Sequence, residues 1–78
     1  GEINFEVSDI EQAIKRIGEH YSHGKIDTTE GLRINFDDWW FIVRQSTAEP
    51  VLRLVVEADN DEKMKKHISG ITDIIKKK

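Results

Sequence analysis

Two apolar runs, rich in β-branched and aromatic residues, constrain the fold of this 78-residue chain more than any other feature. Trp39 to Val43 and Val51 to Val56 have the length and composition of largely buried strands. Between them, the segment Arg44 to Pro50 is mostly polar and contains residue types that favour turns. The sequence therefore predicts two strands joined by a loop whose two ends are held in place.

This loop has side chains that suit an anion. Arg44 carries a planar guanidinium that can bind a phosphate through two hydrogen bonds, and Ser46 and Thr47 carry hydroxyl groups. Successive backbone N–H groups in a turn can also surround an anion. The alternative is an ordinary polar hairpin, in which Ser and Thr bond their own backbone and Pro50 begins the next strand. Local chemistry alone favours the ordinary hairpin.

Periodic patterns predict the remaining elements. Residues 3–7 and 32–36 alternate apolar and polar side chains, which indicates two more half-buried strands. A helix is predicted after Ser8, ending before Gly24, and a second helix after Asp59, each beginning with a capping-box pattern. The apolar stripes of the two helices consist of Ile10, Ala13, Ile14, Ile17 and Tyr21, and of Met64, Ile68, Ile71 and Ile75.

The predicted fold class is α+β, with the element order β-α-β-β-β-α. Because each helix has one apolar stripe, we expect an antiparallel four-stranded sheet with both helices on one face. The strand that begins at Trp39 is apolar on both sides, so Trp40 and Ile42 are expected on the face away from the helices. This aromatic-aliphatic pair is a candidate interface, and its predicted rim consists of Arg33, Arg53 and Glu57.

Composition excludes several classes of function. The chain has no cysteine, so disulfides and thiolate metal sites are impossible. Twelve basic against 15 acidic residues give a net charge of -3, which argues against a general binder of polyanions. No apolar run is long enough to span a bilayer and no signal sequence is recognisable, so a cytoplasmic location is expected. We interpret residues 1–78 as one domain, beginning at a fragment boundary.

Other ionisable residues are interpreted as structural. His20 and His23 have the i, i+3 spacing of a metal-ligand pair, but without further ligands they are expected to lie in solvent at a helix end. His67 is expected to be a semi-exposed helical residue. Asp37 and Asp38 are expected to be solvated turn residues rather than a general acid and base.

A series of residues in the second half of the chain follows a specific pattern, namely Gly31-Leu32, Phe36, Asp38, Trp40, Arg44, Ser46, Glu49-Pro50, Leu52-Arg53 and Glu57-Ala58. The pattern resembles the C-terminal domain of the α-D-phosphohexomutases, which include phosphomannomutases and phosphoglucomutases. The flanking elements fit in type and order, so the resemblance covers nearly the whole chain. It implies a TATA-binding-protein-like fold, and it implies that residues 1–78 are the excised last domain of a four-domain enzyme.

In this family the loop holds the phosphate group of the sugar substrate, namely the one that is not being transferred. The resemblance therefore implies that Arg44, Ser46 and Thr47 contact phosphate, and that Ala48 contributes its backbone N–H. Thr47 stands where the family usually has Gly or Asn, and Ala48 stands where it usually has Thr. Gln45 occupies a position where Pro is common. The expected partner is a hexose phosphate, with mannose, glucose and glucosamine as the alternatives for the sugar.

The family moves a phosphoryl group between the 1- and 6-positions of a hexose through a phosphoserine, with Mg²⁺ at the serine. Neither the serine loop nor the metal-binding acids are recognisable in this chain. We therefore expect no catalytic residue, metal or cofactor here, and an isolated chain that is inactive. Mg²⁺ is implied for the complete enzyme. The other domains of the enzyme are the expected protein partners, with Trp40 and Ile42 as the candidate contact.

Two other classes of function remain open. One is a ferredoxin-like RNA-binding module, which would also place aromatic residues on a sheet, although the ribonucleoprotein pattern and a basic face are missing. The other is a small-ligand or protein-interaction module that uses the face of Trp40 and Ile42. Neither a nucleic acid nor a membrane is expected as a partner.

Overall fold

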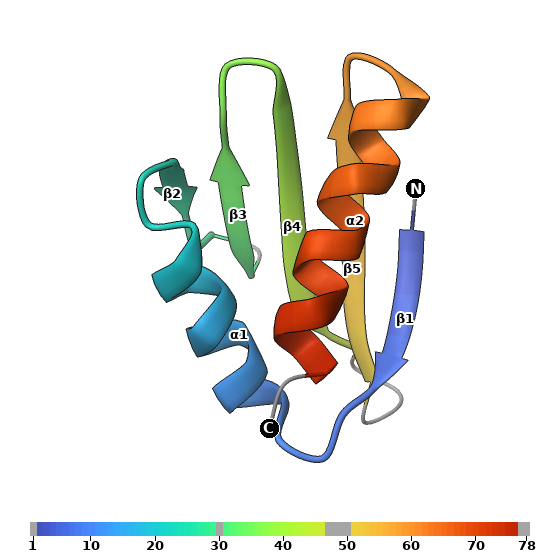
Figure 1. Cartoon of the computed structure of the whole chain (residues 1–78). Coiled ribbons are helices and arrows are strands. Elements are labelled where there is room, and N and C mark those ends of the chain that lie inside the picture. Colours follow the sequence, from blue (N-terminus) through green and yellow to red (C-terminus); the bar gives the residue numbers. More distant parts are fainter. Residues whose placement is uncertain (1, 30, 47–50, 77–78) are drawn as a thin grey trace.

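The α+β class, with an antiparallel sheet covered on one face by two helices, is confirmed by a computed structural model that describes residues 2–29, 31–46 and 51–76 (Figure 1). The strand order in the sheet is β1-β5-β4-β3-β2. In chain order the elements are β1 (Glu2–Glu6), α1 (Ile10–His20), β2 (Lys25–Asp27), β3 (Leu32–Asn35), β4 (Trp39–Gln45), β5 (Val51–Ala58) and α2 (Asp61–Lys76).

The sheet has five strands, so the prediction of four was wrong by one. The additional strand is β2, a short edge strand whose three residues are all exposed. Its central residue, Ile26, pairs with Ile34 of β3, and after it Asp27 Oδ1 accepts a hydrogen bond of 2.9 Å from the Thr29 N–H. Backbone pairing rather than burial forms this strand, and its three residues are too few to show a periodic apolar pattern. The element order also differs from the β-α-β-β-α-β order of a ferredoxin-like module.

The caps of both helices lie one residue later than predicted. Asp9, not Ser8, caps α1, because Asp9 Oδ1 accepts a 3.0 Å hydrogen bond from the Gln12 N–H. At the start of α2, Asn60 rather than Asp59 has this role, with its Oδ1 2.9 Å from the Lys63 nitrogen. Such caps satisfy backbone N–H groups that the first turn leaves without a partner. Neither of the two described helices is long and apolar enough to cross a membrane.

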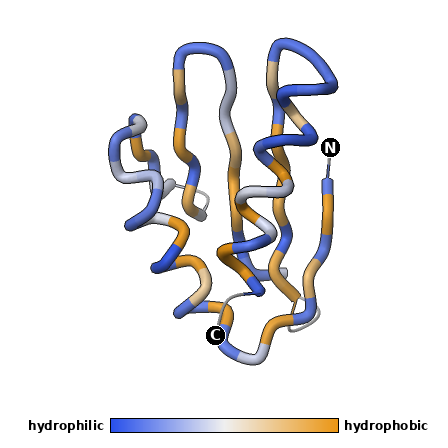
Figure 2. The backbone as a smooth tube through the Cα atoms, in the orientation of Figure 1, coloured by the Kyte–Doolittle hydropathy of each residue, from blue (hydrophilic) through white to orange (hydrophobic). Residues whose placement is uncertain are grey.

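The core lies between the two helices and the face of the sheet that they cover. Figure 2 shows hydrophobic and hydrophilic residues alternating along both helices, as the predicted stripes require. Burial of each large aliphatic or aromatic side chain contributes about 1.5–3 kcal/mol. The residues with no exposed surface are Ala13, Ile17, Ile34, Phe41, Val43, Leu52, Leu54, Val56 and Ile71.

The two faces of β4 differ as the sequence predicts. Trp39, Phe41 and Val43 are buried under the helices, while Trp40 and Ile42 are half-buried on the opposite side. We call this opposite side the helix-free face; its described residues at the centre of the sheet are Arg33, Asn35, Trp40, Ile42, Arg44, Val51, Arg53, Val55 and Glu57.

Candidate functional site

The loop predicted to bind an anion connects β4 to β5, and the structure describes its two ends. The last paired residues, Gln45 and Leu52, lie opposite each other. Beyond them, the Ser46 N–H donates a 3.0 Å hydrogen bond to the Val51 carbonyl. This bond closes the base of the loop and fixes where the Ser46 backbone points. Two of the predicted phosphate contacts, Thr47 and Ala48, lie outside the described residues.

Arg44 is an exposed residue at the end of β4 on the helix-free face. Its cross-strand neighbour is Arg53 of β5. Two like charges directly opposite each other in an antiparallel pair destabilise the sheet. A bound anion would relieve this repulsion, since it attracts both guanidinium groups. Arg44 and Arg53 therefore lie on adjacent strands, each two residues from the closed base of the loop, which also carries the Ser46 hydroxyl.

Arg53 had been interpreted from the sequence only as part of the rim of an interface. The strand register explains why Arg53 lies beside Arg44. Ser46 bonds to Val51, and the residues two positions farther from the loop on each strand, Arg44 and Arg53, are therefore opposite each other. Its Nε lies 3.1 Å from Glu2 Oε1 in a partly exposed ion pair, without hydrogen-bond geometry. A partly exposed pair of this kind contributes little free energy, so it does not prevent Arg53 from reaching an anion.

Gly31 allows the backbone to pack closely against Val43 and Arg44 of β4. Its φ of 120° is a conformation that residues with a Cβ rarely adopt. A Cβ at this position would lie 2.8 Å from the Val43 carbonyl oxygen and 2.9 Å from Arg44 Cβ. The glycine of the sequence pattern is therefore explained by close backbone packing against the strand that presents Arg44.

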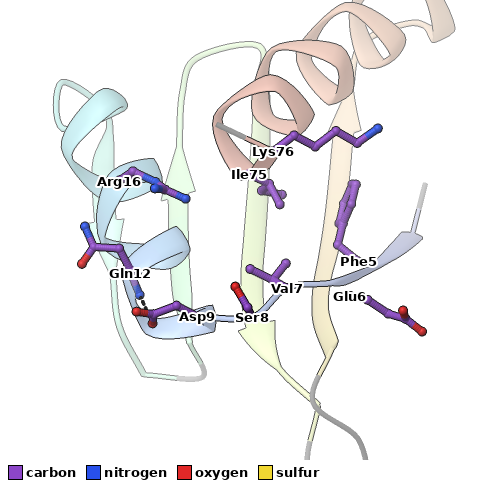
Figure 3. A pocket seen from close by; sticks show the side chains of 9 residues that line it. All are labelled: Phe5, Glu6, Val7, Ser8, Asp9, Gln12, Arg16, Ile75 and Lys76. Atoms are coloured by element: carbon purple, nitrogen blue, oxygen red, sulfur yellow. Dashed lines mark hydrogen bonds between the residues drawn. The ribbon is translucent and has the colours of Figure 1, made fainter. Parts of the chain in front are cut away.

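A cavity of about 430 Å³ lies near this end of the sheet but on the side of the helices (Figure 3). It lies between the start of α1 and the end of α2, and Arg16 lines it with a buried Nε that has no hydrogen-bond partner among the described residues. The carboxylate of Asp9 is already engaged in capping α1. Because Arg44 faces the opposite side of the sheet, Arg44 and the cavity do not belong to one site.

The other end of the sheet carries an aromatic cluster. The rings of His67 and Trp39 are parallel within 4° and their centroids are 3.7 Å apart, and Trp39 also stacks on Phe36 at 4.5 Å. Burial in this stack lowers the pKa of His67 below its usual value of 6.5; the neighbouring charge of Asp38 acts in the opposite direction, and Lys66 and Lys63 add to the lowering. The sequence had indicated only a semi-exposed helical histidine.

Stability should therefore depend on pH through His67. The unfolded chain, with the higher pKa, binds more protons as the pH falls through about 6.5. The contribution of neutral His67 is thus fully present above pH 6.5 and is lost below it. The free energy of unfolding, measured with urea, should fall less between pH 7.5 and pH 5.5 for His67→Gln than for the wild type. His23→Gln is the control, and an equal effect of both substitutions would contradict the assignment.

The remaining candidate residues are apart from the loop. The His20 ring packs edge-on against Tyr21 at 4.9 Å, and the His23 ring packs against Phe36 at 5.1 Å. Asp38 Oδ2 lies 3.3 Å from Lys63 Nζ in an exposed turn. Within residues 2–29, 31–46 and 51–76, no group of three or more His, Asp or Glu residues is arranged to hold a metal ion.

The sequence matches one protein family over most of its length. Residues 2–73 match the model of the family described as phosphoglucomutase/phosphomannomutase, C-terminal domain, and the chain therefore belongs to this family. Its resemblance to the phosphohexomutases, inferred from the loop and its flanking strands, is confirmed.

Individual relatives agree with this assignment. The chain is 39% identical to the phosphomannomutase of Methanocaldococcus jannaschii over 77 residues. This alignment covers 99% of the chain and 17% of the relative. It is 41% identical over 63 residues to the phosphomannomutase of Escherichia coli K12, covering 78% and 14%. Identity to a probable phosphoglucosamine mutase of Methanopyrus kandleri is 37% over 56 residues, covering 72% and 12%. The chain thus spans less than a fifth of the length of these relatives.

Proposed function

We propose that this chain is the phosphate-holding domain of a phosphohexomutase, which moves a phosphoryl group between the 1- and 6-positions of a hexose. In this proposal residues 1–78 are the last of four domains, and Arg44, Ser46, Thr47 and Ala48 hold the phosphate that is not transferred. The observation that carries the proposal is the exposed Arg44 at the end of β4, directly opposite Arg53 and next to the closed base of the loop.

The two arginines suit a phosphate dianion better than a neutral sugar. Arg44 can donate two parallel N–H bonds to phosphate oxygens, and Arg53 can supply a second positive charge from the neighbouring strand. Relief of the repulsion between the two guanidinium groups adds to the binding of an anion. The Ser46 hydroxyl can donate a further hydrogen bond, while its backbone N–H stays engaged with Val51. This makes Arg53 an addition to the residues predicted from the sequence.

Holding the distal phosphate would fix the sugar so that its other end lies in line with the phosphoserine of another domain. Such positioning lowers the barrier by removing translational and rotational freedom before reaction. The bisphosphorylated intermediate has to turn around between the two transfers, so the grip must also release. Binding through an exposed side chain such as Arg44 meets this requirement, because the contact is not deeply buried.

The chemistry itself would lie outside this domain. In the proposed enzyme, Mg²⁺ would supply positive charge at a phosphoserine in another domain, and the described residues of this chain offer no group of three or more ligands that could hold it. The side chains of Arg44, Arg53 and Ser46 are cationic and hydroxyl groups, which suit the substrate phosphate and not a divalent cation. We accordingly expect the isolated chain to be inactive. The cytoplasmic location remains a prediction.

Arg44→Ala in a full-length phosphohexomutase that contains this domain tests the proposal. Loss of a charge-assisted bidentate contact should weaken binding of the hexose phosphate by about 1.5–3 kcal/mol, which corresponds to a rise in KM of about 10- to 150-fold. Steady-state kinetics with mannose and glucose phosphates measure this change.

Lys65→Ala is the matched control for Arg44→Ala. Lys65 is an exposed cation of α2, on the helix side of the sheet, so its removal changes the net charge equally without touching the loop. Its KM should stay within about twofold of the wild type. If Arg44→Ala left both KM and kcat unchanged, the loop would not hold the substrate phosphate.

A further inference from the structure

We propose that the cavity on the helix side of the sheet binds a small organic carboxylate, and that Arg16 pairs with its charge. We call this space, between the start of α1 and the end of α2, the α1–α2 cavity (Figure 3). The proposal does not rest on the phosphate-holding function, because Arg44 lies on the opposite face of the sheet. Three features lead to it: the apolar part of the lining, the unpaired guanidinium of Arg16, and the distribution of charge around it.

The apolar part of the lining comes from both ends of the chain. Phe5 and Val7 pack against the core but are only half-buried, and Ile75 of α2 is 5% exposed. Sites for small molecules have volumes of roughly 300–1,000 Å³ and combine apolar walls with a few polar groups. At about 430 Å³ the α1–α2 cavity is at the small end of this range. It therefore suits a compact molecule with an apolar body.

The guanidinium of Arg16 is directed into this space. Figure 3 shows its side chain extending from α1 toward Ile75, whereas Gln12 extends outward. Arg16 is half-buried, and its buried Nε has no hydrogen-bond partner among the described residues. Buried polar groups in folded proteins nearly always have such a partner, and a charge that is withdrawn from water without a counter-charge costs free energy. A negatively charged acceptor in the cavity would remove both costs, whereas a water molecule would remove only the first.

The acidic residues that line the cavity are directed elsewhere. Asp9 Oδ1 accepts the 3.0 Å hydrogen bond from the Gln12 N–H that caps α1. Glu6 is exposed, and Figure 3 shows its side chain extending away from the cavity. Lys76 is an exposed cation at the rim. The formal charges of the lining therefore cancel, but of these four ionisable residues Arg16 alone is partly withdrawn from water. The interior of the cavity presents a positive charge.

One inward guanidinium beside an apolar wall defines the chemistry of the ligand. The planar fork of an arginine matches a planar carboxylate, which accepts two parallel N–H bonds from it. A phosphate monoester carries about two negative charges at neutral pH, so a single inward cation would leave it incompletely neutralised beside Glu6 and Asp9. A carboxylate carries one charge, and the apolar body attached to it can contact Phe5 and Val7. The expected ligand is therefore an organic monocarboxylate.

An amide NMR titration of the chain with phenylbutyrate, a carboxylate on an apolar body, tests the proposal. Binding should be saturable, with a Kd on the order of 1 mM for a ligand of this size. The neutral analogue phenylbutanamide should bind at least about tenfold more weakly, because it cannot form the ion pair. Phenyl phosphate should also bind more weakly at this place. The shifted amides should be those of the lining, namely Val7, Ser8, Gln12, Arg16 and Ile75.

Arg16→Gln and Lys15→Gln are a matched pair of variants. Both remove one positive charge from α1, but Lys15 is exposed and does not line the cavity. The Kd for phenylbutyrate should rise at least about tenfold in Arg16→Gln and stay within about twofold of the wild type in Lys15→Gln. Arg16→Met keeps a long side chain without the charge. It should melt at no lower temperature than the wild type, since an unpaired half-buried charge does not stabilise the free chain.

Several results would overturn the proposal. One is the absence of saturable shifts at the lining residues with phenylbutyrate well above the expected Kd, and another is equal binding of the neutral amide. Tighter binding of phenyl phosphate would exclude the monocarboxylate. Shifts confined to Arg44 and Arg53 would assign the binding to the loop arginines instead, and a lower melting temperature of Arg16→Met would make the guanidinium a structural group. The KM of Arg44→Ala reports separately on the phosphate-holding function.

Discussion

Phe41→Ala should lower the free energy of unfolding of this chain by about 3–5 kcal/mol. Phe41 is fully buried in the central strand β4, and its ring packs against Tyr21 at 5.2 Å and Trp39 at 5.5 Å. Truncation to alanine removes this apolar burial and leaves a cavity between the sheet and the helices. Because a core of 78 residues supports only a few kcal/mol of net stability, the variant should be largely unfolded at room temperature.

Ile42→Ala provides the matched control at the next position of the same strand. Ile42 faces away from the helices and is half-buried, so its truncation should cost only about 1 kcal/mol in this chain. Urea unfolding followed by far-UV circular dichroism measures both variants. The assigned faces of β4 would be wrong if Ile42→Ala proved as destabilising as Phe41→Ala.

The second large effect is expected for Gly31→Ala, at about 2–4 kcal/mol of destabilisation. The added Cβ would have to accept a φ of 120° and would meet the Val43 carbonyl oxygen at 2.8 Å. Backbone atoms in a central strand cannot move aside as the end of a flexible side chain can. Movement of β4 to relieve the contact would also shift Arg44, so substrate binding by the full-length enzyme should weaken together with stability.

Gly18→Ala distinguishes this effect from a general intolerance of alanine for glycine. Gly18 lies inside α1, and the nearest atom to a Cβ there would be Leu32 Cδ2 at 3.3 Å, at the end of a side chain that can shift. Alanine is also the better helix former by about 0.5–1 kcal/mol. The free energy of unfolding of Gly18→Ala, measured by thermal unfolding, should therefore stay within about 1 kcal/mol of the wild-type value. Equal destabilisation by both substitutions would show that the conformation of Gly31 has no special role.

Local patterns were sufficient to predict most elements and the family. The apolar runs of β4 and β5 and the stripes of both helices are periodic signals that burial produces in any sequence. They also placed Trp40 and Ile42 on the helix-free face, because side chains in a strand alternate strictly. The helix caps were each predicted one residue too early, since neighbouring residues can all cap a helix and the path of the chain decides between them.

Only the tertiary structure decided features that depend on pairing between distant segments. Strand β2 is held by backbone bonds to β3, and Ile26 is the one apolar residue among its three, which is too few for a periodic signal. The stack of His67 on Trp39 joins α2 to β4, and no local pattern predicts such a contact. Thr47 and Ala48 lie outside the described residues, so their contacts with phosphate remain predictions.

The candidate site shows the same division. The sequence by itself determined that a loop with Arg44 and Ser46 joins two buried strands, because composition and periodicity are local properties. The structure decided that Arg53 lies opposite Arg44, since register depends on which backbone groups pair across the hairpin. It also explained Gly31, whose need for a small residue comes from the backbone of another strand lying within 3 Å of where a Cβ would be.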